Sequence, residues 1–279
     1  MALINYAVIA ETSIADQLLS AIIPGLLTAF FICIYAFYTG KKRNYGGGEK
    51  FSFQNFIDGW KSAGIYTYAT YFINSFIMVI PTTLLTIASS ALVAYGFARF
   101  NFPFKKQLFA ILIATLMLPN SVIIIPRYVL FNKFGWVDSY MPFWVPALLA
   151  CYPFFIYQLI QFMRGIPRDL DEAATIDGCS KYKVYSHIIL PLMKPSIVTT
   201  VIIQFYWKWD DYLGPLLYLS RPQSYTVSIA IKLFADSAST TDYGAMFAMS
   251  TLSLIPVFLI FLFFNRYLVQ GIGTSGLKG

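Results

Sequence analysis

The stretch from Gln204 to Tyr212 places charged and aromatic side chains inside a hydrophobic segment, with the sequence QFYWKWDDY. Charges at membrane depth are costly and usually face a cavity or a partner. Aromatic rings beside hydrogen-bonding groups suit a sugar, because its C–H faces stack on rings while its hydroxyl groups need donors and acceptors. If the stretch is helical, one face holds four of its polar and aromatic side chains: Gln204, Lys208, Asp211 and Tyr212.

This stretch therefore supplies candidates for side chains that line the path of a substrate through the membrane. These substrate-path residues are Gln204, Trp207, Lys208, Trp209, Asp211 and Tyr212. The alternative is packing, in which Lys208 and Asp211 neutralise each other at a contact between subunits. The charge of Lys208 would also favour an acidic sugar, although Asp210 and Asp211 argue against a simple anion site.

No other part of the chain shows a pattern for catalysis, metal binding or nucleotide binding. A G-x-G-x-x-G pattern at 271–276 follows a hydrophobic span instead of joining a strand to a helix, and no Walker motif occurs. The thiols and the single imidazole are scattered along the chain, at Cys33, Cys151, Cys179 and His187. We therefore expect a protein that is not an enzyme and that binds no metal or cofactor directly.

The composition is that of a membrane protein. Of the 279 residues, 58% are hydrophobic and 12% are charged, whereas about a quarter of residues are charged in a soluble domain. A membrane-spanning helix needs about 20 mostly apolar residues, and six segments qualify: 18–39, 72–97, 107–129, 141–163, 197–219 and 245–268. Prolines within the third, fourth and sixth of them predict kinks. The predicted fold is all-α, with about six transmembrane helices.

The longest charged run between hydrophobic spans extends from Arg164 to Pro195, with the sequence RGIPRDLDEAATIDGCSKYKVYSHIILPLMKP. Pro167 fits the start of a helix, where no N–H partner is needed. Gly178 fits the left-handed position that ends one. Acidic side chains would lie at the positive end of the helix dipole, at Asp169, Asp171 and Glu172.

A second short helix should follow, capped by Ser180 and stopped by Pro191. The first helix would present small and charged residues on one face, as a helix pressed into another protein's groove does: Leu170, Ala173, Ala174 and Asp177. The alternative is a solvated loop between two membrane spans.

The residue order in this segment closely resembles the EAA loop of ABC-importer permeases. Glu172-Ala173-Ala174 is followed by Asp177-Gly178 and then by Leu190-Pro191. In that family the loop is the coupling helix that docks on the cytoplasmic ATPase subunit, so the resemblance implies this role for Glu172, Ala173, Ala174, Asp177 and Gly178. From about Phe72 to Gly279 the chain is similar to the maltose-type, carbohydrate-uptake branch, whereas residues 1–71 match weakly.

The resemblance implies a type I importer permease in the cytoplasmic (inner) membrane of a prokaryote, crossing it several times. Its partners would be a second permease, two ATPase subunits that hold ATP and Mg, an external or periplasmic solute-binding protein, the sugar and membrane lipid, with no nucleic acid. The tail would contact the ATPase subunits through Gly276 and Lys278.

One permease domain would occupy residues 1–279. It comprises an N-terminal span and external loop (1–71), core spans (72–268) with the coupling loop at 164–195, and a cytoplasmic tail (269–279). This orientation places most Lys and Arg residues of the later loops inside, as the positive-inside rule expects. The loop from Lys41 to Lys61 is the exception, since it would lie outside despite its basic residues.

The expected function is import of a sugar or oligosaccharide by alternating access, driven by partner ATPase subunits. One alternative is an ABC permease for amino acids or peptides, against which the Gly-rich tail and the aromatic fifth span argue. Another is a stand-alone secondary transporter or channel, for which the EAA pattern would be a coincidence.

Overall fold

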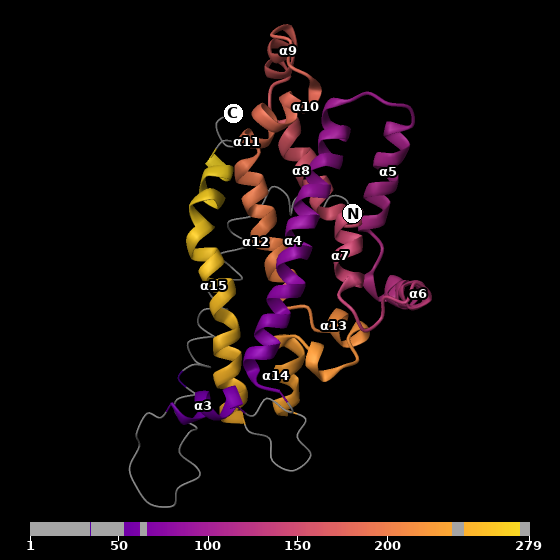
Figure 1. Cartoon of the computed structure of the whole chain (residues 1–279). Helices are drawn as coiled ribbons and strands as arrows, with labels where there is room; N and C mark the ends of the chain where they lie inside the picture. The colour runs from indigo at the N-terminus through magenta and orange to yellow at the C-terminus, as the bar shows by residue number, and fades with distance from the viewer. Residues whose placement is uncertain (1–33, 35–52, 62–65, 236–242, 274–279) are drawn as a thin grey trace, which may run out of the picture. The chain divides into compact units, whose positions relative to one another are not determined.

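The computed structural model describes residue 34 and residues 53–61, 66–235 and 243–273, and every regular element in those ranges is a helix (Figure 1). This confirms the all-α prediction for the described ranges. The predicted span at 18–39, residue 34 apart, and the tail residues Gly276 and Lys278 lie outside them. The chain divides into two compact units, one of residues 77–208 and one of residues 1–76 with 209–279.

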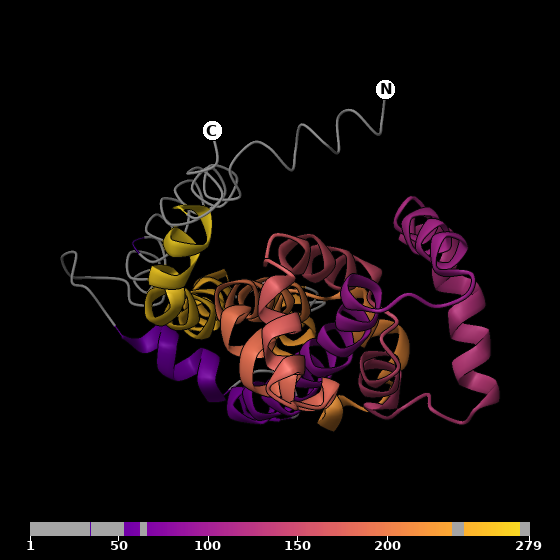
Figure 2. The same ribbon diagram turned by 90° about the horizontal axis from the view of Figure 1, so that it is seen from above.

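The unit of residues 77–208 is built around two helices, α4 (Tyr68–Arg99) and α8 (Pro153–Arg164), whose apolar side chains supply much of a shared core. α5 (Lys105–Leu116) packs against α8, and Figure 2 shows α5 and α6 (Asn120–Lys133) at one side of this unit. Its other elements are α7 (Met141–Leu148), α9 (Asp169–Ile176), α10 (Lys181–Val184), a π-helical turn (Tyr185–Ile189), α11 (Leu190–Leu192) and α12 (Lys194–Trp209).

The other unit centres on α15 (Tyr243–Gly273), against which α3 (Gln54–Lys61) and α14 (Val227–Ala235) pack. A Cβ on Gly59 of α3 would lie 2.9 Å from Met249 Cγ, so glycine is needed for this close approach. Tyr68, at the start of α4, donates a hydrogen bond from its hydroxyl to the Met249 carbonyl at 3.1 Å. The unit also contains α13 (Leu213–Tyr218) and a 3₁₀ turn (Pro222–Ser224).

Helices long and apolar enough to cross a membrane occur in both units. Three segments qualify within the described residues, Tyr68–Arg99, Met141–Arg164 and Tyr243–Phe264. Two bent pairs, α5 with α6 and α10–α11 with α12, raise the number to five if each pair is one span. These segments overlap the second through sixth predicted spans, although residues 181–192 of the second bent pair lie in the segment predicted to be the coupling loop.

The third and fifth predicted spans are not continuous helices. The chain bends by 104° between α5 and α6. The bend arises because Pro119 lacks an N–H group and disfavours helical geometry at the residue before it. The predicted span at 197–219 breaks after Trp209, and α13 begins only at Leu213. There Asp211 Oδ1 accepts a hydrogen bond from Gly214 N at 2.9 Å, a local bond that competes with the helical ladder.

Candidate coupling site and substrate path

The first helix of the EAA segment forms as its sequence predicts. α9 begins just after Pro167 and Arg168 and carries its acidic residues in the first turn, where the helix dipole favours negative charge. It ends in a Schellman motif, in which Gly178 N donates to Thr175 O at 3.1 Å and Cys179 N donates to Ala174 O at 2.9 Å. Gly178 has φ +79°, which confirms its left-handed position.

The second helix begins as predicted but does not end where expected. Ser180 caps α10, since its Oγ accepts a hydrogen bond from Lys183 N at 3.4 Å. Pro191 does not stop the helix, which continues through a π-helical turn and α11 to Leu192. The widened turn precedes the proline and rearranges the backbone bonds that its ring would otherwise disturb. The chain bends by 72° only at Met193, before α12.

Apolar packing holds α9 against its own unit. Ala174 is 6% exposed and belongs to a core cluster with residues of α4, α8 and the π-helical turn. Ala174, which we expected to contact an ATPase subunit, is buried in this structure, where its methyl group packs in the core of its own unit. Buried members of the same cluster include Ala94, Ala98, Leu159, Met163, Val184 and Ile189.

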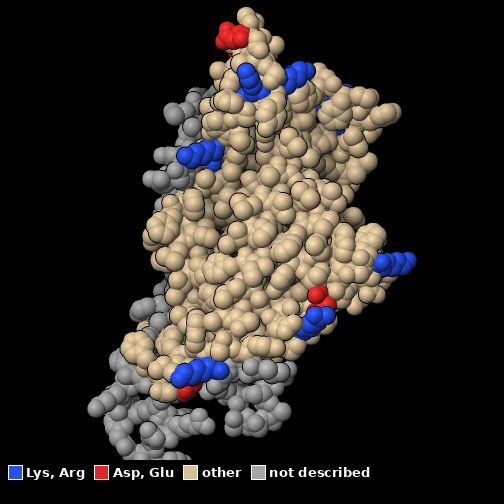
Figure 3. Space-filling model, viewed as in Figure 1, with Lys and Arg blue, Asp and Glu red and all other residues tan. Residues whose placement is uncertain are grey.

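The opposite side of α9 is open to solvent. Figure 1 shows α9 at one end of its unit, and Figure 3 shows acidic atoms at that tip with basic atoms next to them. Ile176 is 85% exposed, the highest value among the large hydrophobic side chains of the described residues. Four predicted coupling residues are also exposed, namely Glu172, Ala173, Asp177 and Gly178. A shallow hollow beside them is lined by Asp171, Glu172, Thr175 and Ile176.

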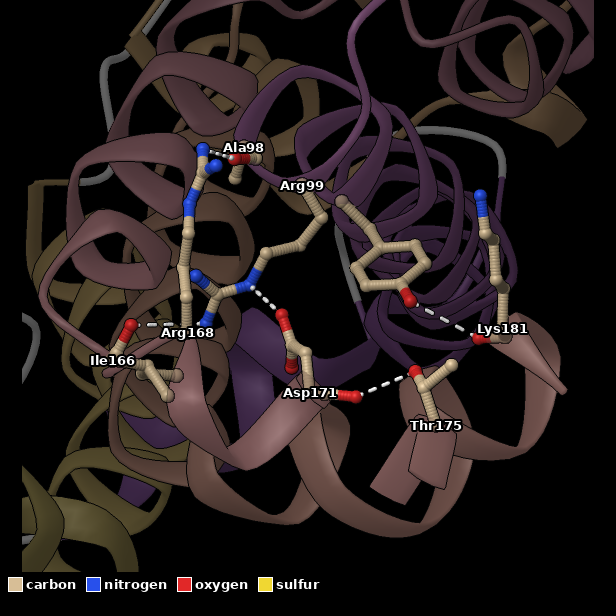
Figure 4. A network of polar contacts seen from close by, with 8 residues as sticks. Ala98, Arg99, Ile166, Arg168, Asp171, Thr175 and Lys181 are labelled. Atoms are coloured by element: carbon tan, nitrogen blue, oxygen red, sulfur yellow. Dashed lines mark hydrogen bonds and ion pairs between the residues drawn. The ribbon is translucent and has the colours of Figure 1, made fainter. Parts of the chain in front are cut away.

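An ion pair and hydrogen bonds fix the start of α9 to the end of α4 (Figure 4). Arg99 Nε lies 2.9 Å from Asp171 Oδ2, with the two side chains 5% and 22% exposed. Arg99 Nη2 also donates to the Ile166 carbonyl at 3.0 Å. In the reverse direction, Arg168 Nη2 donates to the Ala98 carbonyl at 3.2 Å, which satisfies one of the carbonyls left open at a helix end.

The start of α10 is attached to the same end of α4. The Tyr95 hydroxyl donates to the Lys181 carbonyl at 3.0 Å, and Lys181 Nζ lies 4.9 Å from the centre of the Phe100 ring. Tyr95, Arg99 and Arg168 are functional candidates that sequence reasoning missed. The sequence signal for them was the group of aromatic and basic residues at the end of the second span. We had used the basic ones only to predict which loops are cytoplasmic.

Three of the predicted substrate-path residues lie in the unit of residues 77–208, on α12, whose last residue is a fourth, Trp209. Gln204 is 1% exposed, and its Nε2 donates to Thr86 Oγ1 at 3.0 Å. Trp207 is 46% exposed, with its ring centre 5.0 Å from that of Phe154. Lys208 Nζ lies 5.4 Å from the centre of the Tyr152 ring. Trp207 and Lys208 therefore join aromatic residues of α8 in a mixed aromatic and cationic cluster.

The other three, Trp209, Asp211 and Tyr212, belong to the unit of residues 1–76 with 209–279. The expected single helical face from Gln204 to Tyr212 is wrong, because the helix ends at Trp209. Trp209 is buried, and its Nε1 donates to the Ser253 carbonyl at 2.8 Å, so this ring packs against α15. Asp211 caps the backbone at Gly214, and the Tyr212 ring centre lies 5.8 Å from Lys232 Nζ.

The sequence pattern of the family described as binding-protein-dependent transport system inner membrane component matches residues 87–274. The chain belongs to this family. The match includes the coupling segment and both parts of the predicted substrate path, and the permease is therefore a multi-pass protein of the inner membrane.

Curated relatives and solved structures agree with this assignment. The permease is 30% identical to the arabinooligosaccharides transport permease of Bacillus subtilis, over 82% of this chain and 79% of the relative. It is 30% identical to the trehalose/maltose transport permease of Thermococcus litoralis, over 76% of each chain. A chain of a bacterial ABC transporter that imports the acidic polysaccharide alginate has the same fold, with a TM-score of 0.71, 16% identity, and coverage of 91% of this permease and 98% of that chain.

A second family, the DctM component of tripartite ATP-independent periplasmic transporters, matches residues 1–126 of this permease. This match covers less than half of the chain and overlaps the first family at residues 87–126. The permease matches the two transport permeases over more than three quarters of their length, so the stand-alone transporter alternative is not favoured.

Proposed function

We propose that this permease imports a sugar or oligosaccharide as one membrane subunit of an ABC importer. The observation that carries the proposal is the tip of α9, which is open to solvent on one side and fixed to α4 on the other. Family membership supports a role in binding-protein-dependent transport. The relatives' names refer to arabinooligosaccharides and to trehalose and maltose, which supports a sugar over an amino acid or peptide.

The exposed side chains of α9 would dock on an ATPase subunit. Ile176 supplies an apolar anchor, and Glu172 offers a carboxylate to a basic partner residue. ATP and Mg would be bound and hydrolysed by the two ATPase subunits alone. Their closure would move α9 and shift the membrane helices between outward- and inward-facing states. The tail residues Gly276 and Lys278 would contact the same subunits.

The sugar would contact this chain at the cluster around Trp207 and Lys208. The exposed Trp207 ring offers a face on which a sugar can stack, and Lys208 and the Tyr152 hydroxyl offer hydrogen bonds. Asp211 and Tyr212 stay predicted substrate-path residues. A second permease subunit and an external solute-binding protein would complete the importer.

The test is uptake by the complete importer in proteoliposomes, with its solute-binding protein outside and ATP inside. Radiolabelled maltose, trehalose, arabinotriose and an alginate disaccharide serve as neutral and acidic probes, with methionine as the amino acid control. We expect ATP-dependent uptake of at least one sugar and none of methionine. Uptake that persists without the ATPase subunits, or that is confined to the amino acid, would refute the proposal.

A further inference from the structure

We propose that the Arg99–Asp171 ion pair is the mechanical link through which α9 moves α4. Asp171 and Arg99 would act as positioning residues that transmit motion, whereas the neighbouring Glu172 faces the ATPase subunit. The inference rests on the proposed function, because it takes α9 to be the docking helix.

The two consecutive carboxylates of α9 point in different directions. Asp171 is largely covered and lies against the Arg99 guanidinium, whereas Glu172 is exposed. Arg99 holds α9 at two points, since it contacts Asp171 within the helix and the Ile166 carbonyl before it. A movement of α9 along or across its axis would therefore pull on the end of α4.

The apolar side chains that α9 and the end of α4 bring to the shared core are small. They include Ala174 of α9 and, on α4, Ala94 and Ala98. Arg99 adds charged contacts to this packing, since it pairs with the Asp171 carboxylate and donates a charge-assisted hydrogen bond to the Ile166 carbonyl. The opposed bond from Arg168 to the Ala98 carbonyl adds resistance to rotation.

The experiment follows α4 directly in the assembled importer. A nitroxide is attached at the exposed α4 position Leu92 in a background with Cys33, Cys151 and Cys179 replaced by alanine. Its spectrum is recorded before and after ATP with orthovanadate closes the ATPase subunits. The variants are Asp171→Asn, Arg99→Gln and the reversed pair Arg99→Asp with Asp171→Arg. Asp169→Asn removes an exposed acid from the same helical turn and is the matched control.

We expect the control to behave as wild type, with a clear change in the spectrum on closure. Asp171→Asn and Arg99→Gln should keep the ATPase subunits bound, lose the change at Leu92 and slow sugar uptake about tenfold. The reversed pair should recover part of both readouts, because it restores the ion pair but not the bond to Ile166. Recovery by reversal would show that the effect runs through the ion pair. Loss of the change at Leu92 while the ATPase subunits stay bound is the readout that a merely structural role would not produce.

Two results would overturn the inference. In the first, Asp171→Asn retains the full change at Leu92, or the wild type itself shows none, so that α4 does not follow α9 through this pair. In the second, Asp171→Asn releases the ATPase subunits as Glu172→Ala is expected to do, which would make Asp171 part of the docking surface. Failure of the proposed function is distinguishable, because the wild-type permease would then purify without ATPase subunits.

Discussion

Gln204 on α12 donates a hydrogen bond from Nε2 to the hydroxyl oxygen of Thr86 on α4, over 3.0 Å. Thr86 in turn donates to the carbonyl of Thr82 at 2.7 Å, and all three side chains are buried. The bond joins two long helices of one unit. In this structure Gln204 therefore ties two helices together, which favours packing, the alternative to its predicted contact with sugar.

Replacing Gln204 with leucine should lower stability modestly and leave sugar preference unchanged. Hydrogen bonds between membrane helices contribute about 0.6 kcal/mol on average and up to about 1.7 kcal/mol, and Thr86 keeps its bond to Thr82. Thermal unfolding of the purified importer measures the first effect, and competition between sugars for uptake measures the second. A changed sugar preference would instead show that Gln204 contributes to recognition of the sugar.

The two tryptophans at the end of α12 should respond differently to substitution. Trp207→Leu and Lys208→Met remove the exposed ring and the charge, so they should change which sugar competes best for uptake. Trp209→Phe should destabilise the protein by about 0.5–1.5 kcal/mol, because it removes the hydrogen bond from the buried indole to the Ser253 carbonyl. Its sugar preference should stay that of the wild type. Unchanged preference in all three variants would show that the cluster serves packing only.

Gly178→Ala tests the backbone conformation at the end of α9. A side chain at this left-handed position costs about 1–2 kcal/mol, although a Cβ there would meet no atom of this chain within 4 Å. We expect the variant to insert into the membrane but to lose ATPase subunits during purification. Gly135→Ala is the matched control, since Gly135 has φ +68° and equally open surroundings but lies at the end of α6. Equal loss of ATPase subunits from both variants would point to general instability.

Leucine at Ala173 and leucine at Ala174 should impair the permease in different ways. Ala174→Leu overfills a packed core, at about 1–3 kcal/mol, and should expose residues 164–195 to limited proteolysis. Ala173→Leu should leave the loop resistant, because this side chain faces solvent, while it reduces co-purification of ATPase subunits. If residues 164–195 of the Ala174→Leu variant resist proteolysis as well as those of the wild type, the assignment of Ala174 to the core is contradicted.

Cysteine labelling tests the orientation of the membrane spans. A cysteine at Lys181 should react with an impermeant reagent only from the cytoplasmic side, and one at Lys232 only from outside. Both positions are exposed in the structure, and alanine replaces the native cysteines as background. Reaction of both from one side would contradict the predicted topology.

Features that depend on neighbouring residues were accessible from the sequence. Gly178 and Ser180 mark the ends of α9 and α10, because a left-handed turn and a side-chain cap involve residues only a few positions apart. The apolar segments follow from composition for the same reason. The ordered EAA pattern identified the family through residues within a single loop.

Tertiary structure decided which of those residues face inward. Asp171 and Glu172 are chemically alike and adjacent, yet Asp171 meets Arg99, which lies 72 residues earlier in the chain. Ala174 differs from Ala173 only because α4 and α8 cover one side of α9. Trp209 differs from Trp207 because α15 supplies the carbonyl that binds its indole. Burial depends on what the rest of the chain brings to a residue, and local periodicity carries no information about those partners.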